Sequence, residues 1–175
     1  MSSSSFSSVP FDSAKAAADH AQHMLATGKS RTEILTHLAT AGETLSGPDT
    51  TVSILVLDAA GLLRNGASPK LPADYLRAID GLKPDANVGT CAAAAATGSV
   101  VFTPDFCADG KWTELRHLPL ALGYLGAWSM PIKSSSGTVL GTFGTYFRSR
   151  RRPTQEERKG VETLVATAAV VLSQN

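Results

Sequence analysis

Residues 125–149 hold the feature that most constrains the fold, a pair of long apolar strands around a serine-glycine turn. The strands read GAWSMPIK and TVLGTFGTYF, and the turn falls at residues 134–137. Apolar side chains occupy both alternating sets of positions, so neither face of these strands suits contact with water. Residues 51–58, TVSILVLD, have the same character. Such strands lie inside a sheet that is covered on both faces.

The remaining patterns predict helices that could supply this cover. Residues 12–25 are rich in alanine and form one helix. Ser30 and Glu33 form a capping box that opens a second helix, which runs to about residue 45. Thr154 and Glu157 form another capping box and open the last helix. Short strands and helices fill the middle of the chain. The order predicts an α+β three-layer sandwich, with a mainly antiparallel sheet and helices on both faces.

Length and composition favour one globular domain. The chain has 175 residues, 43% hydrophobic and 18% charged, with a net charge of +1. We expect a serine-rich disordered tail at residues 1–11 and one domain at residues 12–175. The small net charge argues against nucleic-acid and membrane partners. With no secretory signal in the sequence, we expect a cytoplasmic protein whose two cysteines, Cys91 and Cys107, are reduced.

Four segments, taken in order, resemble a known family. They read VLDAAGLLRNGAS, LPADYLRAIDGL, GTCAAAAATGSVVFTPDF and WSMPIKSSSGTVLGTFGTYFRSRRRPTQEE. Together they are similar to GAF domains, especially those of bacterial sensor histidine kinases and related signalling proteins. The resemblance covers about residues 30–174.

This resemblance implies both a fold and a function. The fold would have a six-stranded antiparallel sheet, with the terminal helices on one face and a small-molecule pocket on the other. The protein would be a non-catalytic sensory domain in signal transduction. It would form a homodimer through its terminal helices and signal through them to a kinase or other effector. The identity of the ligand or cofactor stays open.

Cys91 is the first chemical candidate, because it stands at the start of an alanine-rich helix. Helix amides and the helix dipole lower the pKa of a thiol there, which favours a reactive thiolate. The alternative is a small buried residue that packs beside alanine. The amides of residues 88–90 could bind an anion, or Thr90 could cap the helix.

Aromatic residues with a polar group are typical walls of a ligand pocket. Trp112 is expected in the pocket, and Phe143 and Phe147 in the core. His117 lies on the segment expected to cover the pocket. The predicted ligand-binding residues are Val88, Gly89, Thr90, Cys91, Phe102, Trp112, His117, Tyr124, Trp128 and Tyr146.

Two other functions stay open beside the sensor. The first is a thiol redox enzyme or sensor that uses Cys91 and resembles free methionine sulfoxide reductase, although the downstream cysteine motif of that family is missing. The second is a dimerisation module without a ligand. No cysteine and histidine spacing fits zinc, so we expect no metal. We also expect no enzyme activity, because the enzyme is the less favoured interpretation of Cys91. The basic run RSRRRP at residues 148–153 either contacts a nucleic acid or phosphorylated partner, or is a solvated loop.

Overall fold

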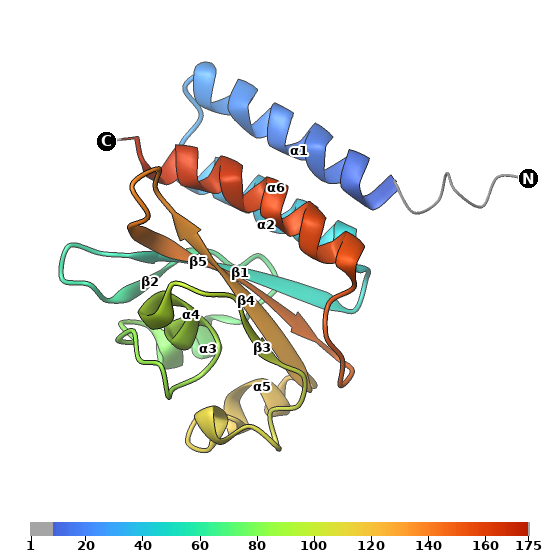
Figure 1. Cartoon of the computed structure of the whole chain (residues 1–175), viewed down its shortest axis with the longest axis vertical. Coiled ribbons are helices and arrows are strands. Elements are labelled where there is room, and N and C mark those ends of the chain that lie inside the picture. Colours follow the sequence, from blue (N-terminus) through green and yellow to red (C-terminus); the bar gives the residue numbers. More distant parts are fainter. Residues whose placement is uncertain (1–8, 175) are drawn as a thin grey trace, which may run out of the picture.

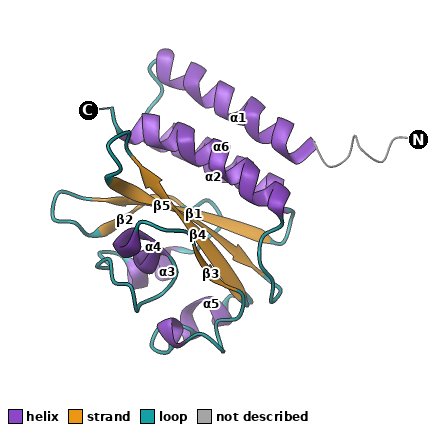
Figure 2. Cartoon of the chain, in the orientation of Figure 1, coloured by secondary structure: helices purple, strands orange, loops and turns teal. Residues whose placement is uncertain are grey.

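The structure, a computed structural model, describes residues 9–174 and has three layers (Figure 1). In chain order its elements are α1 (Val9–Ala26), α2 (Arg31–Ser46), β1 (Thr50–Leu57), β2 (Leu63–Ala67), α3 (Ala73–Ile79), α4 (Cys91–Thr97), β3 (Val101–Thr103), η1 (Gly110–Trp112), α5 (His117–Ala121), β4 (Gly126–Lys133), β5 (Val139–Phe147) and α6 (Gln155–Leu172). Helices α2 and α6 cover one face of the sheet, with α1 packed on their outer side, and α3, α4 and α5 lie on the other face (Figure 2). The predicted α+β sandwich is confirmed.

The sheet is antiparallel throughout, in the order β2-β1-β5-β4-β3. The hairpin of β4 and β5 forms as predicted, and its turn is closed by a 2.8 Å hydrogen bond from the Ser134 amide to the Thr138 carbonyl. The expected sixth strand is wrong, because the described residues form a sheet of five. A further antiparallel pairing occurs beside β2, between Leu63 and Leu82, but it is an isolated bridge and does not extend into a strand.

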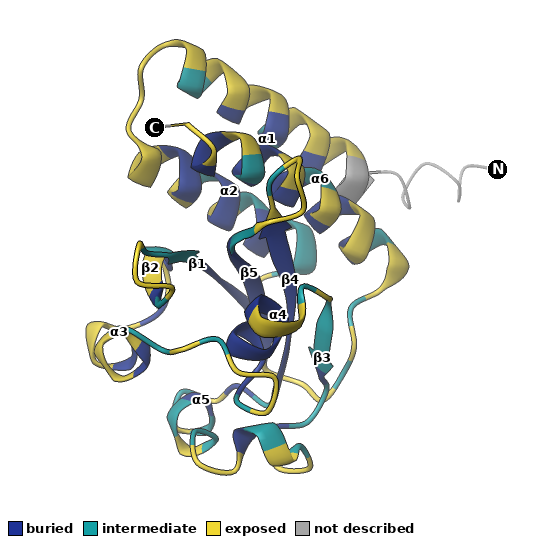
Figure 3. Cartoon of the chain, turned by 60° about the vertical axis from the view of Figure 1, so that its left-hand side comes forward, coloured by how far each residue is buried: buried dark blue, intermediate teal, exposed yellow. Residues whose placement is uncertain are grey.

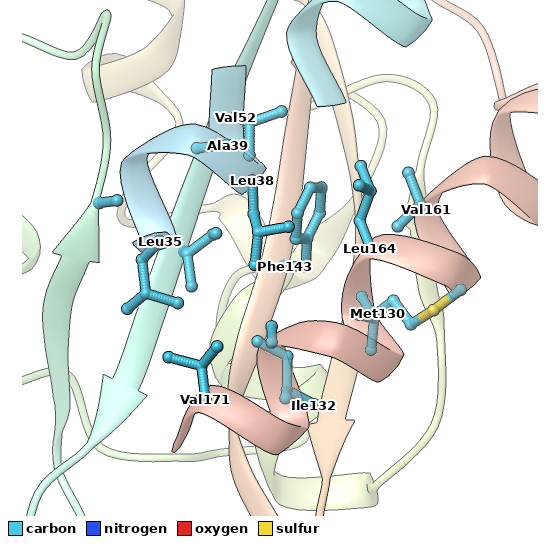
Figure 4. Packing of buried hydrophobic residues seen from close by; sticks show 14 of the residues in the cluster. Leu35, Leu38, Ala39, Val52, Met130, Ile132, Phe143, Val161, Leu164 and Val171 are labelled. Carbon is cyan, nitrogen blue, oxygen red and sulfur yellow. The ribbon is translucent and has the colours of Figure 1, made fainter. Parts of the chain in front are cut away.

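The face of the sheet under α2 and α6, called the helical face below, holds the larger apolar core (Figure 4). Its strand residues alternate along β1, β4 and β5, because every second side chain points to this face. Phe143 is 1% exposed and lies here, as does Phe147, so both belong to the core as expected. Besides Phe143, Figure 4 labels these residues of the core: Leu35, Leu38, Ala39, Val52, Met130, Ile132, Val161, Leu164 and Val171.

The helix ends follow the capping patterns in the sequence. In α6 the Glu157 amide donates to the Thr154 hydroxyl at 3.1 Å, and the Thr154 amide donates to the Glu157 carboxylate at 2.9 Å. In α2 the Glu33 amide donates to the Ser30 hydroxyl at 3.2 Å, but the Glu33 carboxylate does not bond back to the Ser30 amide, so this predicted capping box is only half formed. The first helix begins at Val9, before the expected start at residue 12. Residues 1–8 of the predicted tail lie outside the described residues.

Candidate functional site

The two faces of the sheet differ in chemistry. The face under α3, α4 and α5 carries hydroxyl groups, whereas the helical face is almost entirely apolar. Thr51 and Tyr124 share a 2.5 Å hydrogen bond on the hydroxyl face, and Ser53 and Ser68 share one of 2.7 Å. Buried hydroxyls are costly unless they are paired. These two pairs offset the cost of burying four hydroxyl groups on this face.

Helix α4 places Cys91 against this face. The residues from Cys91 to Ala95 are buried, and the end of the helix is exposed (Figure 3). Ser129 donates a 3.4 Å hydrogen bond to Sγ of Cys91. A Cβ atom at Gly144 would lie 2.7 Å from the same sulfur, so the glycine makes room for the thiol. Burial raises the pKa of the Cys91 thiol, although the hydrogen bond from Ser129 opposes the shift. Of the two interpretations of Cys91, its burial favours the small packed residue over the activated thiolate.

Thr90 does not cap α4. Its hydroxyl accepts a 2.8 Å hydrogen bond from Nε1 of Trp112 and shares one of 2.9 Å with Thr103. The amide of Gly89 donates to the Lys111 carbonyl at 2.8 Å. The amide of Val88 likewise donates to a backbone carbonyl, at 3.2 Å. Neither amide is free for an anion, so the anion-binding interpretation of this loop loses two of its donors.

Aromatic rings form the wall opposite Cys91. Phe106 and Trp112 lie with ring centroids 4.5 Å apart, and both are buried. Tyr75 of α3 donates a 2.8 Å hydrogen bond to the hydroxyl of Tyr146 on β5. Tyr124 contacts Tyr146 at a centroid distance of 5.6 Å. Burial raises the pKa of both Tyr75 and Tyr146, so these hydroxyls stay protonated at neutral pH.

These groups enclose a small apolar cavity. Its volume is about 20 Å³, enough for about one water molecule. Ligand pockets for drug-sized molecules are typically about 300–1,000 Å³, so a ligand would have to displace part of the cover. None of the described residues that line the cavity carries a charge. They are Leu55, Tyr75, Ile79, Leu82, Gly89, Thr90, Cys91, Ala92, Trp112, Leu115 and Tyr146.

Comparisons with known proteins identify the family to which this chain belongs. A family model described as GAF domain matches residues 28–173. The chain belongs to the GAF domain family. It is also 33% identical over 149 residues to the methyl sulfide methyltransferase-associated sensor of Methanosarcina acetivorans. The match covers 85% of this chain but only 15% of that much longer protein.

Solved structures share the GAF fold. A domain of a two-component sensor histidine kinase protein from Sinorhizobium meliloti 1021 has a TM-score of 0.67 and 22% identity, over 82% of this chain and 90% of that one. A GAF sensor protein from Burkholderia vietnamiensis has a TM-score of 0.71 and 14% identity, over 91% and 93%. The reduced form of fRMsr of Staphylococcus aureus has a TM-score of 0.70 and 12% identity, over 91% and 95%. The fold therefore occurs in sensors and in fRMsr.

The GAF domain brings half of the predicted site residues to the cavity. Gly89, Thr90, Cys91, Trp112 and Tyr146 line it. Tyr124 packs directly behind Tyr146.

The other predicted residues lie elsewhere. His117 is exposed on α5, beside a surface groove of about 440 Å³ between α3 and α5. Val88 precedes the cavity and does not line it. Phe102 and Trp128 stack at 6.1 Å and pack with the helical core, on the opposite face of the sheet from Cys91.

Sequence reasoning missed the contribution of α3. Tyr75 and Ile79 both line the cavity, and both are buried. Their spacing of four residues places them on one face of a helix. That signal was readable in the segment LPADYLRAIDGL.

Residues 9–174 contain no helix that is long and apolar enough to span a membrane. In the same part of the chain, no cluster of three histidine, cysteine or acidic residues is arranged to bind a metal. Cys91 and Cys107 are both free thiols, and neither forms a disulfide.

Proposed function

We propose that this GAF domain is a non-catalytic sensory module that binds a small uncharged molecule at the cavity beside Cys91. The observation that carries the proposal is a cavity walled by hydroxyl and aromatic groups without a charged side chain. A charged ligand would lose its hydration there and gain no opposite charge. A neutral, flat molecule would gain apolar contact and hydrogen bonds from Thr90 and the tyrosines.

Binding would move the cover, since the cavity holds about one water molecule as it stands. The cover that would move contains Trp112 and Leu115, which belong to the irregular segment between β3 and β4. This segment bonds largely within itself. The Arg116 guanidinium donates to the Cys107 carbonyl at 2.8 Å. Such a segment can shift as one piece while the sheet beneath it stays fixed.

Contacts from this cover to α6 support signalling through the terminal helix. Arg148, at the end of β5, donates a 2.8 Å hydrogen bond to the Leu122 carbonyl. Its guanidinium also lies 4.6 Å from the ring centroid of Tyr124. Three residues later Arg151 pairs with Glu157 in the first turn of α6 at 2.7 Å. Movement of the cover would therefore act on the segment that sets the start of α6.

The terminal helices also support a homodimer, which stays part of the proposal. Helices α1 and α6 lie side by side on the outside of the domain (Figure 1). A kinase or other effector is the proposed receiver, by analogy with the domain of similar fold that comes from a two-component sensor histidine kinase protein. A cytoplasmic location and the lack of a nucleic-acid partner stay predictions from the sequence.

The competing function is a thiol enzyme like free methionine sulfoxide reductase, which the fold similarity to fRMsr keeps open. Two features argue against it. Burial raises the pKa of the Cys91 thiol, whereas thiol–disulfide chemistry needs the thiolate. Free methionine sulfoxide carries an ammonium and a carboxylate, and the described cavity residues offer no charge to either.

Native mass spectrometry of freshly purified protein tests the sensor. We expect a noncovalent mass on the wild type, and its loss from Trp112→Ala. An empty wild-type protein, also after incubation with cell extract, would favour the dimerisation module. The enzyme is tested separately with free methionine sulfoxide and dithiothreitol. Turnover that Cys91→Ala abolishes and Cys107→Ala preserves would establish the enzyme and refute a purely sensory role.

A further inference from the structure

The start of α6 carries a charged surface that the cavity does not use. We propose that Arg152 and Arg158, held on the ring of Phe102, form a docking surface for an acidic segment of a partner protein. The surface lies on the helical side of the sheet, on the other face from the cavity. The inference therefore stands independently of the proposed ligand.

One aromatic ring positions both guanidinium groups. Their Cζ atoms lie 4.9 Å and 5.2 Å from the ring centroid of Phe102. Phe102 in turn stacks on Trp128, with an angle of 13° between the ring planes, and Trp128 is 1% exposed. The stack thus runs from the core to the surface. It holds two long side chains that would otherwise be free to rotate, so less conformational entropy is lost when they bind a partner.

These two arginines have no acidic partner among residues 12–174. The neighbouring arginines do: Arg151 pairs with Glu157 at 2.7 Å, and Arg150 pairs with Asp105 at 3.3 Å. Arg152 and Arg158 form no such ion pair, and both are exposed. Two like charges held beside one ring repel each other. Carboxylates from outside would relieve the repulsion and accept bidentate hydrogen bonds.

The local charge pattern favours an acidic protein segment over a nucleic acid. The whole chain has a net charge of +1, which gives little long-range attraction for a polyphosphate. Asp105, Glu156 and Glu157 also interrupt the arginines and would repel a continuous phosphate backbone. A peptide can place carboxylates only where the arginines stand. It can also lay apolar side chains against the exposed edge of Phe102, which is only partly buried.

Fluorescence anisotropy tests the surface with a fluorescein-labelled octaglutamate peptide at low salt. We expect saturable binding that weakens as salt is added. The double variant Arg152→Ala, Arg158→Ala should lower the affinity about tenfold or more. The variant Arg152→Lys, Arg158→Lys keeps the charge but loses the planar groups, and should lie between the two.

The control variant is Lys29→Ala, Arg31→Ala, which removes two exposed cations at the other end of the helical layer (Figure 1). It should bind octaglutamate like the wild type, because neither Lys29 nor Arg31 is held on an aromatic ring among residues 12–174. Equal losses in the two alanine variants would reduce the effect to net charge and overturn the proposal. Tighter binding of a labelled single-stranded DNA octamer than of octaglutamate would overturn it too, and so would the absence of any binding. Circular dichroism checks that each variant stays folded.

Discussion

The hydroxyl of Tyr75 donates a 2.8 Å hydrogen bond to the hydroxyl of Tyr146, and this bond joins α3 to the middle of the sheet. Both side chains are buried, with 4% and 5% of their surfaces exposed. The two rings meet edge to face with centroids 6.0 Å apart. Helix α3 is short, so this contact is a main determinant of its position over the cavity.

Breaking the tyrosine pair should cost stability from either side. Tyr75→Phe leaves the buried Tyr146 hydroxyl without its partner, and Tyr146→Phe does the same to the buried Tyr75 hydroxyl. Each variant should lower the free energy of unfolding by about 1–3 kcal/mol. The double variant should lose less than the sum, because no orphaned hydroxyl remains. Urea denaturation measures all three, and additive losses would show that the two hydroxyls are not coupled.

The contact between Gly144 and Cys91 predicts a rescue. Gly144→Ala places a methyl group 2.7 Å from Sγ of Cys91, and should destabilise the fold by about 1–3 kcal/mol. Cys91→Ala removes the sulfur, so the double variant should recover much of that loss in thermal or urea unfolding. Gly110→Ala is the matched control, because its methyl group would meet no atom within 4 Å. A Gly144→Ala variant as stable as Gly110→Ala would contradict this geometry.

The Arg151–Glu157 pair predicts acid sensitivity. Burial opposes ionisation of Glu157, but hydrogen bonds from Arg151 and the Thr154 amide outweigh it, so its pKa is lowered below 4.5. The carboxylate therefore adds stability above pH 4.5, which is lost as the pH falls through the folded-state pKa.

Glu157→Gln tests this dependence. At pH 7 the variant should be less stable than the wild type by about 1–3 kcal/mol. The difference should shrink as the pH falls through the folded-state pKa of Glu157, which lies below 4.5, because the wild-type carboxylate is then protonated too. Glu33→Gln, at the equivalent position of α2, is exposed and should change stability by less than about 0.5 kcal/mol. A Glu157→Gln loss that is constant from pH 7 to acid would refute the assigned role of the charge.

Enlarging the cavity should create a binding site for a known molecule. Trp112→Ala removes a buried indole and should cost about 3–5 kcal/mol. Added indole should fill the space, donate to the Thr90 hydroxyl, and raise the melting temperature of the variant but not of the wild type. Benzothiophene has a similar shape without the N–H group and should give a smaller shift. Equal shifts would show that Thr90 does not select for a donor.

The layers were predictable from the sequence, but the faces of the strands were not. Apolar runs in residues 51–58 and 125–149 required cover on both sides, and the structure has it. The same runs do not indicate which face each side chain occupies. Side chains alternate between the two faces, but the alternation is invisible in the sequence when both faces are apolar. Trp128 was therefore expected at the cavity but lies with the helical core.

Side-chain partners distant in the sequence explain the remaining differences. Thr90 was weighed as a helix cap, but its hydroxyl accepts from Trp112, which is 22 residues away. Cys91 was weighed as an activated thiol, but the close packing permitted by Gly144 buries it and raises its pKa. Neither contact can be predicted from the spacing of nearby residues in the sequence. Local capping signals, by contrast, need no distant partner, and the Thr154 and Glu157 box formed as predicted.

The hydroxyl pairs at the sheet have one further consequence. In the bonds between Thr51 and Tyr124, and between Thr90 and Thr103, either oxygen can be the donor. An O–H bond can rotate to reverse such a contact while every heavy atom keeps its place. The pair of Thr90 and Thr103 can therefore redistribute its protons when a neighbouring donor such as the Trp112 indole moves away, while the sheet beneath keeps its shape.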